Sequence, residues 1–164
     1  MYRNILLCYD GTIEGRNALM EGTELALALR AHTHLLAILR SGDADLRSEL
    51  AESSSSAQPT GSAAMLRPSQ LHNAQQQVAM QILREGVEWL KARHLDAQGQ
   101  VVFGDPASHI VACARALAID LIVVGHHRRG QLGRWWSEDG DAALLEIAPC
   151  SVLVAMGPMG TTDR

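Results

Sequence analysis

The sequence alternates short, mostly apolar runs with longer segments of helical periodicity, and this alternation limits the fold more than any other feature. The runs have the length of β-strands, and turn-forming or polar residues follow them. Five such runs occur, at residues 4–9, 34–39, 97–103, 120–124 and 151–154. Near-continuous apolar strands are typical of parallel sheets that are covered on both faces. The pattern therefore predicts an α/β fold with an open, doubly wound five-stranded parallel sheet of the Rossmann-like type.

Helical segments separate the predicted strands. They fall at residues 15–30, 70–94, 105–116 and 139–147. The second of these has the clearest apolar stripe at helical spacing, with a polar opposite face. The third begins with Asp105 in a capping position and Pro106 in the first helical position, and Pro149 follows the fourth. Because each helix connects two strands, the crossovers are expected to be right-handed and the strands parallel.

The length of 164 residues predicts one domain that can bury its own core. We expect this domain to span residues 1–156, with a frayed tail at 157–164. Residues 41–69 contain eight serines, and we interpret this polar segment as a flexible loop. A lid or docking loop is the alternative interpretation.

Charge and apolar patterning exclude several functional classes. The 14 Lys and Arg against 18 Asp and Glu give a net charge of −4, which disfavours binding to nucleic acid through phosphate neutralisation. No apolar run approaches the roughly 20 residues of a membrane span, and no signal peptide is recognisable. Cys8, Cys113 and Cys150 are too few for a disulfide framework and are expected to be small buried residues. We therefore expect a cytoplasmic protein with no membrane or nucleic-acid partner.

The predicted fold also locates the candidate site. In doubly wound sheets, ligands bind beyond the carboxyl ends of the strands, at the point where the strand order reverses. The first and fourth strands meet at that point, so we expect Asp10 to lie close to the loop after Gly125. The ends of the second and third strands, at Leu39 and Gly104, border the same region.

Sequence signatures of catalysis are absent. The chain has no nucleophile elbow, P-loop, CxxC or HExxH motif, so binding is favoured over turnover and no catalytic or metal-binding residue is assigned. His126 and His127 are adjacent and would point in opposite directions in an extended chain. His32 and His34 share one face, but no third ligand is evident. His109, early in a helix, is expected at the polar surface.

Four segments together resemble the universal stress proteins. They are residues 5–12 (ILLCYDGT), 104–106 (GDP), 120–125 (DLIVVG) and 148–154 (APCSVLV). The resemblance covers almost the whole chain and is weakest at residues 41–69. It implies a stress-response or regulatory binding protein that forms a homodimer through its last strand. That strand is apolar and predicted at a sheet edge, which agrees with pairing to another chain. The dimer residues so implied are Ser151, Val152, Leu153 and Val154.

The ATP-binding members of that family carry the pattern G-x2-G-x9-G-S/T after the fourth strand, and this chain departs from it. Gly125 matches the first glycine, whereas Arg128 replaces the second and Glu138-Asp139 replaces the closing pair. Glycines let the backbone approach phosphate, and the amides of a helix start bind it. A long side chain and two carboxylates oppose both contacts, so we expect no ATP binding of the family type.

The alternative is an adenine-nucleotide-binding protein with an altered phosphate loop that hydrolyses slowly or not at all. Arginine side chains would then hold the phosphate, and acids such as Asp139 would hold Mg²⁺. Asp10 matches the acid that family members place near the ribose. The nucleotide-like cleft so predicted comprises Asp10, Gly11, Thr12, Leu39, Gly104, Gly125, Arg128, Arg129, Gly130, Glu138 and Asp139. No obligatory cofactor is expected, and weak binding of ATP or AMP with Mg²⁺ belongs to this alternative.

Trp135 and Trp136 stand out because aromatic residues make up only 4% of the chain. One interpretation is that the two indoles fill apolar positions of the fold. The other is a docking surface for a protein partner, because Trp is enriched at interaction hot spots.

Overall fold

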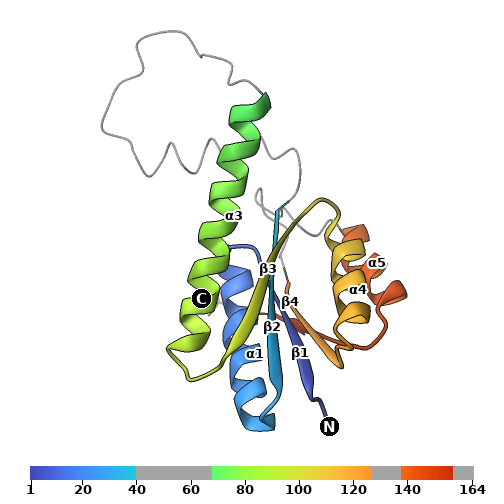
Figure 1. Ribbon diagram of the computed structural model, residues 1–164. Coiled ribbons are helices and arrows are strands. Elements are labelled where there is room, and N and C mark those ends of the chain that lie inside the picture. The colour runs from blue at the N-terminus through green and yellow to red at the C-terminus, as the bar shows by residue number, and fades with distance from the viewer. Residues whose placement is uncertain (40–67, 127–137, 157–164) are drawn as a thin grey trace, which may run out of the picture.

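The computed structural model describes residues 1–39, 68–126 and 138–156. These residues form a five-stranded sheet and four helices (Figure 1). The strands are β1 (Asn4–Tyr9), β2 (His32–Leu39), β3 (Ala97–Phe103), β4 (Leu121–Gly125) and β5 (Ser151–Ala155). The helices are α1 (Ile13–Leu29), α3 (Pro68–Lys91), α4 (Pro106–Ala116) and α5 (Glu138–Ile147).

All neighbouring strands are parallel, in the order β3-β2-β1-β4-β5. The predicted α/β class and strand adjacency are confirmed. The chain builds outward from β1 to β3 on one side and from β4 to β5 on the other, so the order reverses between β1 and β4. The bounds differ only locally: α1 begins at Ile13 rather than Gly15, because Thr12 caps it.

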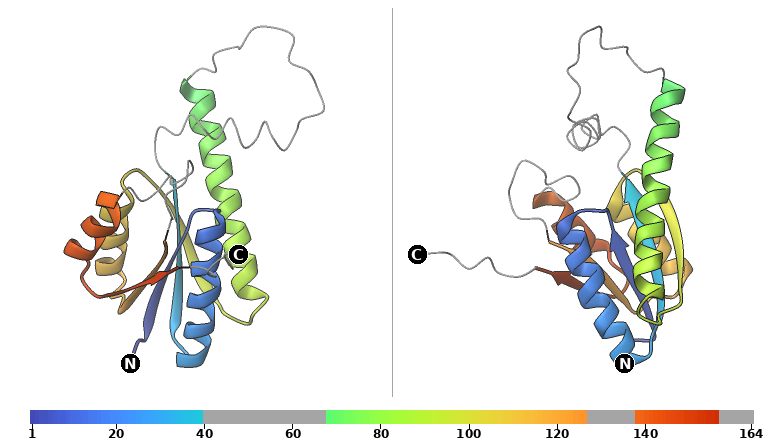
Figure 2. Two further views of the ribbon diagram at one scale, coloured as in Figure 1. Left: turned by 180° about the vertical axis from the view of Figure 1, so that it is seen from behind. Right: turned by 90° about the vertical axis from the view of Figure 1, so that its left-hand side faces the viewer.

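Two helices cover each face of the sheet. Helices α1 and α3 lie on one face, and α4 and α5 lie on the other, as the opposite views show (Figures 1 and 2). Helix α1 packs on β1 and β4, and α3 packs on β2 and β3. The first turns of α3 extend past the carboxyl ends of the strands, so this face is taller than the opposite one (Figure 2).

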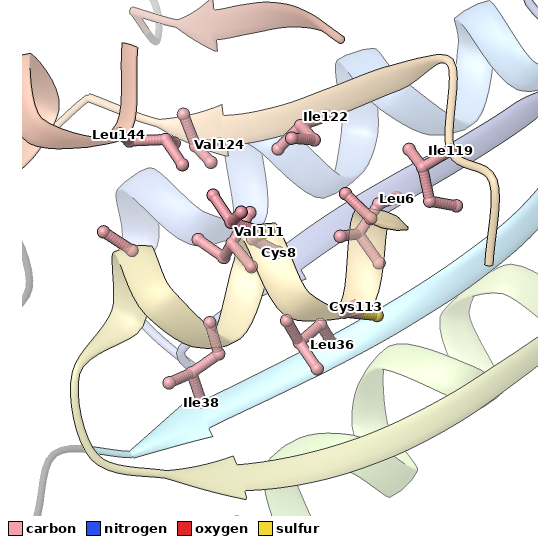
Figure 3. Packing of buried hydrophobic residues seen from close by; sticks show 13 residues of the cluster. Leu6, Cys8, Leu36, Ile38, Val111, Cys113, Ile119, Ile122, Val124 and Leu144 are labelled. Carbon is pink, nitrogen blue, oxygen red and sulfur yellow. The ribbon is translucent and has the colours of Figure 1, made fainter. Parts of the chain in front are cut away.

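The alternating side chains of β1 supply both cores. Leu6 and Cys8 point into the cluster under α4 and α5, which Figure 3 shows, whereas Ile5, Leu7 and Tyr9 belong to the cluster under α1 and α3. All five side chains are at most 6% exposed. Asp120 holds the amino end of β1. Its Oδ2 atom accepts hydrogen bonds from the backbone N–H groups of Arg3 and Asn4, at 2.7 and 2.8 Å. These two bonds lower the pKa of Asp120.

The three cysteines are free thiols. Cys8 and Cys113 are buried as expected, whereas Cys150 is only partly buried. Burial raises the pKa of each thiol, and most strongly that of Cys8. Among the described helices, none is long and apolar enough to cross a membrane.

Gly22 sets how closely α1 approaches the sheet. A Cβ atom at this position would overlap Leu7 Cδ2 and would lie 3.3 Å from Val123 Cγ1. We predict that Gly22→Ala lowers the free energy of unfolding by about 1–3 kcal/mol, because overpacking outweighs the better helix propensity of alanine. Urea unfolding measures the change. Glu21→Ala, at an exposed position of the same turn, is the control and is expected to be close to neutral.

Candidate functional site

The reversal of strand order brings the ends of β1 and β4 together. The two strands pair as Ile5 with Leu121, Leu6 with Ile122 and Leu7 with Val123. Both strands therefore end at a similar level, and Asp10 follows β1 beside the end of β4. This confirms the predicted adjacency of the ends of β1 and β4, whereas the closeness of Asp10 to the loop after Gly125 stays a prediction. The loop after it, at residues 127–137, lies outside the described residues.

A network of short hydrogen bonds fixes the turn between β1 and α1. Oδ1 of Asp10 accepts from the backbone N–H of Thr12 at 2.9 Å and from its hydroxyl at 2.5 Å. The Thr12 hydroxyl in turn accepts from the backbone N–H of Gly15 at 3.0 Å, which caps the start of α1. The same hydroxyl therefore connects the half-buried carboxylate to the helix.

Two glycines make this turn possible. Gly11 has a φ of +82°, a left-handed conformation that glycine adopts without strain, and Ile82 of α3 packs against it. Gly15 leaves room for the carboxylate, because a Cβ atom there would overlap Asp10 Oδ1. Gly11 and Thr12 were predicted site residues, whereas Gly15 and Ile82 were not.

Tyr9 anchors the turn to both covering helices. Its ring is 2% exposed and lies between Gly15 of α1 and Gly86 of α3, where a Cβ atom would come within 3.3 Å of the ring on either side. Arg16 Nε donates to the Tyr9 hydroxyl at 3.4 Å. This bond is the main cause of the raised pKa of Arg16. The position of Asp10 thus depends on a buried ring that precedes it.

The ends of β2 and β3 form the other side of the site. The backbone N–H of Gly104 donates to the carbonyl oxygen of Leu39 at 3.0 Å. Asp105 caps α4 by accepting from the N–H and the hydroxyl of Ser108 at 2.9 and 2.6 Å. The predicted cap is therefore confirmed.

His109 is a site neighbour that the sequence interpretation placed at the polar surface. It is half-buried, and a Cβ atom at Gly104 would lie 3.1 Å from its Nε2 atom. Gly104 has a φ of +126°, and this backbone conformation brings it against the ring. The five-residue separation of the two positions gave no signal for this contact, because it arises from the bend between β3 and α4.

The phosphate half of the predicted cleft is less fully described. Gly125 is buried at the end of β4, opposite Ala155 of β5. Glu138 and Asp139 are the first two residues of α5. Several predicted residues lie outside the described ranges, namely Arg128, Arg129, Gly130, Trp135, Trp136 and almost all of the 41–69 segment.

The described part of the site offers the carboxylate of Asp10, backbone groups at the strand ends and the imidazole of His109. Within residues 1–39, 68–126 and 138–156, no group of three or more His, Cys, Asp or Glu residues could hold a metal ion. These groups are suited to binding a polar ligand by hydrogen bonds. The strand order places the chain among the doubly wound α/β proteins.

The chain belongs to the universal stress protein family, whose model matches residues 1–155. A comparison with curated proteins found no match. Similar solved structures share the fold at low sequence identity. Universal stress protein UspA from Lactobacillus plantarum is 21% identical over 94% of this chain and 98% of that one, with a TM-score of 0.67.

Two further similar structures contain an adenine nucleotide. A universal stress protein in complex with cAMP is 20% identical over 96% of this chain and 99% of its own, with a TM-score of 0.63. The universal stress protein from Archaeoglobus fulgidus in complex with dAMP is 13% identical over 94% and 98%, with a TM-score of 0.58. At such identities the likeness concerns the fold.

Thr12 is the residue through which the site can be tested separately from any ligand. We predict that Thr12→Val lowers the free energy of unfolding by about 1–2 kcal/mol, because it removes the cap of α1 and a bond to Asp10. Thr12→Ser keeps the hydroxyl and is expected to retain most of the stability. Equal losses for the two variants in urea unfolding would show that the methyl group matters rather than the network.

Proposed function

We propose that this family member is a regulatory binding protein whose cleft accepts an adenosine carrying a single phosphate in preference to ATP. The proposal combines the two interpretations of the sequence. The part of the cleft that would hold adenosine keeps the acid of the family pattern at Asp10, and the part that would hold the phosphates departs from that pattern. The observation that carries it is the Asp10 turn, fixed by Thr12 and Gly15 beside the end of β4. In this proposal the protein binds its ligand without turnover.

The adenosine half is supported by the chemistry of the strand ends. A carboxylate at the end of the first strand suits a sugar hydroxyl. Asp10 Oδ1 already accepts from Thr12, and Oδ2 is shielded from solvent in this structure. Contact between Asp10 and a ribose therefore requires the surroundings of Oδ2 to open. The related proteins that bind cAMP and dAMP support a ligand of this size.

The phosphate half favours a short ligand. Arg128 replaces the glycine that would let the backbone approach phosphate, and Glu138 and Asp139 add carboxylates at the start of α5. A like-charge pair at a few ångströms costs roughly 1–4 kcal/mol, depending on solvent exposure. AMP reaches less far toward this helix than ATP, so AMP is affected less.

The preference can be measured directly by calorimetry. We predict that AMP binds to the purified protein at least about tenfold more tightly than ATP, with or without Mg²⁺, because the additional phosphates meet the carboxylates. Tighter binding of ATP would contradict the proposal and would favour phosphate recognition by the arginines. If neither nucleotide binds, the proposal that the cleft still recognises adenosine is contradicted.

Rebuilding the phosphate loop tests whether Arg128, Glu138 and Asp139 are what opposes ATP binding. The triple variant Arg128→Gly, Glu138→Gly, Asp139→Ser restores the family pattern. We predict a gain in ATP affinity of about thirty- to a thousand-fold, through new phosphate contacts and the loss of two repulsive charges. AMP is expected to gain less. Arg129→Gly, at a position off the pattern, is the matched control, and an equal gain there would contradict the alignment.

We also propose that two copies pair through the free edge of β5. This strand lies at the edge of the described sheet, and Val152, Leu153 and Val154 are only half-buried. Met156, which directly follows β5, is 52% exposed. An apolar edge strand is a ready template for pairing.

We predict a dimer in sedimentation equilibrium, weakened at least about tenfold by Met156→Lys, because a lysine beside an edge strand opposes pairing. Met20→Lys is the control, because Met20 is similarly exposed at 45% but lies on α1. A monomeric wild-type protein, or equal weakening by both variants, would contradict pairing through β5.

A further inference from the structure

A pair of imidazoles lies on β2, toward the end of the sheet opposite the proposed nucleotide cleft. Alternate residues of β2 point to the same face, which places His32 and His34 in line with Leu36 and Ile38. Leu36 and Ile38 are fully buried, and Figure 3 shows them directed toward α4. His34 is only half-buried and His32 is exposed.

Over β2, the cover provided by α4 ends near Leu36, whereas Leu6 on the neighbouring β1 is still buried in the same cluster. Cys113, in the second half of α4, accepts a bond from Gln100 of β3 at 3.0 Å, and Gln100 is the register partner of Leu36. His34 and His32 lie one and two steps farther toward the amino end of β2. They therefore occupy a stretch of sheet face that α4 leaves open to solvent.

The strand that carries the histidines is held on both sides. His32 pairs with Asn4 and His34 with Leu6 on β1, and His34 pairs with Gln98 on β3. None of these three register partners carries a charge. Within the described part of the chain, no side chain is hydrogen-bonded to either imidazole. Both rings are thus mounted on rigid backbone and are available to an external ligand.

The spacing suits chelation of one metal ion. Two residues along a strand are about 6.6 Å apart, and both side chains stand on the same face. Imidazole nitrogens bind late first-row metals at about 2.0–2.1 Å, so two of them on one ion at right angles lie roughly 3 Å apart. Rotation about the side-chain bonds brings two rings on neighbouring same-face positions toward this separation.

We propose that His32 and His34 chelate one divalent late first-row metal ion, with Cu²⁺ bound more tightly than Ni²⁺ or Zn²⁺ and with water completing its coordination. Imidazole suits all three ions, and the general order of stability places Cu²⁺ first. The described residues offer no third protein ligand, which leaves positions open to solvent. The site is independent of the proposed nucleotide function, because the histidines precede the buried half of β2 whereas the cleft follows its end.

The test is a titration of the untagged full-length protein with Cu²⁺ in a non-coordinating buffer, followed by calorimetry and electron paramagnetic resonance. We expect one tight site with nitrogen hyperfine structure. His32→Gln and His34→Gln are each expected to weaken it at least about tenfold, because one-point attachment loses the effective concentration of the second ring. Circular dichroism checks that both variants are folded.

The matched control is the double variant His126→Gln, His127→Gln, which removes the other sequence-neighbouring pair and is expected to leave the tight site unchanged. Loss of the tight site in this control, or its survival in both single variants, would overturn the proposal. A second measurement in urea tests the role of the strand. Affinity is expected to fall at least about tenfold on unfolding, and equal affinity in the unfolded chain would overturn the proposed geometry.

Discussion

The burial of β1 on both edges and both faces is the constraint on which the rest of the molecule depends. β2 and β4 pair with its two edges, and its alternating side chains enter both cores. Its amino end is held by Asp120. Its carboxyl end leads directly into the Asp10 turn. The apolar packing of β1 therefore fixes the position of Asp10, the carboxylate of the proposed site, which directly follows the strand.

The architecture was predictable because its signals are local and strong. Parallel strands covered on both faces are recognisable as apolar runs, and Asp105 stands where a cap is needed. The cap at Thr12 was not predicted, so α1 begins earlier than expected. The position of Asp10 beside β4 followed from strand order alone. The contacts that shape the site are different in kind. These contacts join segments whose approach depends on packing, and no local sequence pattern predicts them. They are Ile82 against Gly11, Gly86 against Tyr9 and Gly104 against His109.

The two ends of the sheet carry different chemistry. At the carboxyl ends, backbone groups and one carboxylate are gathered at the change of strand order, which suits a ligand recognised by hydrogen bonds. Toward the amino end of β2, the exposed His32 and the half-buried His34 stand on the same strand face as Leu36, beyond the part of β2 that α4 covers. The first site is a consequence of topology that family members share. The second depends on two side chains and on how far one helix extends.

The Thr12 hydroxyl bonds to the Asp10 carboxylate and to the start of α1 at the same time. Selection for folding therefore acts on this acid whether or not a nucleotide is bound. A lineage that lost its ligand would still keep the aspartate, the threonine and the nearby glycines. In such proteins, retention of the acid during evolution can reflect its role in stabilising the start of the helix. Retention of the ligand can be judged only from site residues that have no such role in stability.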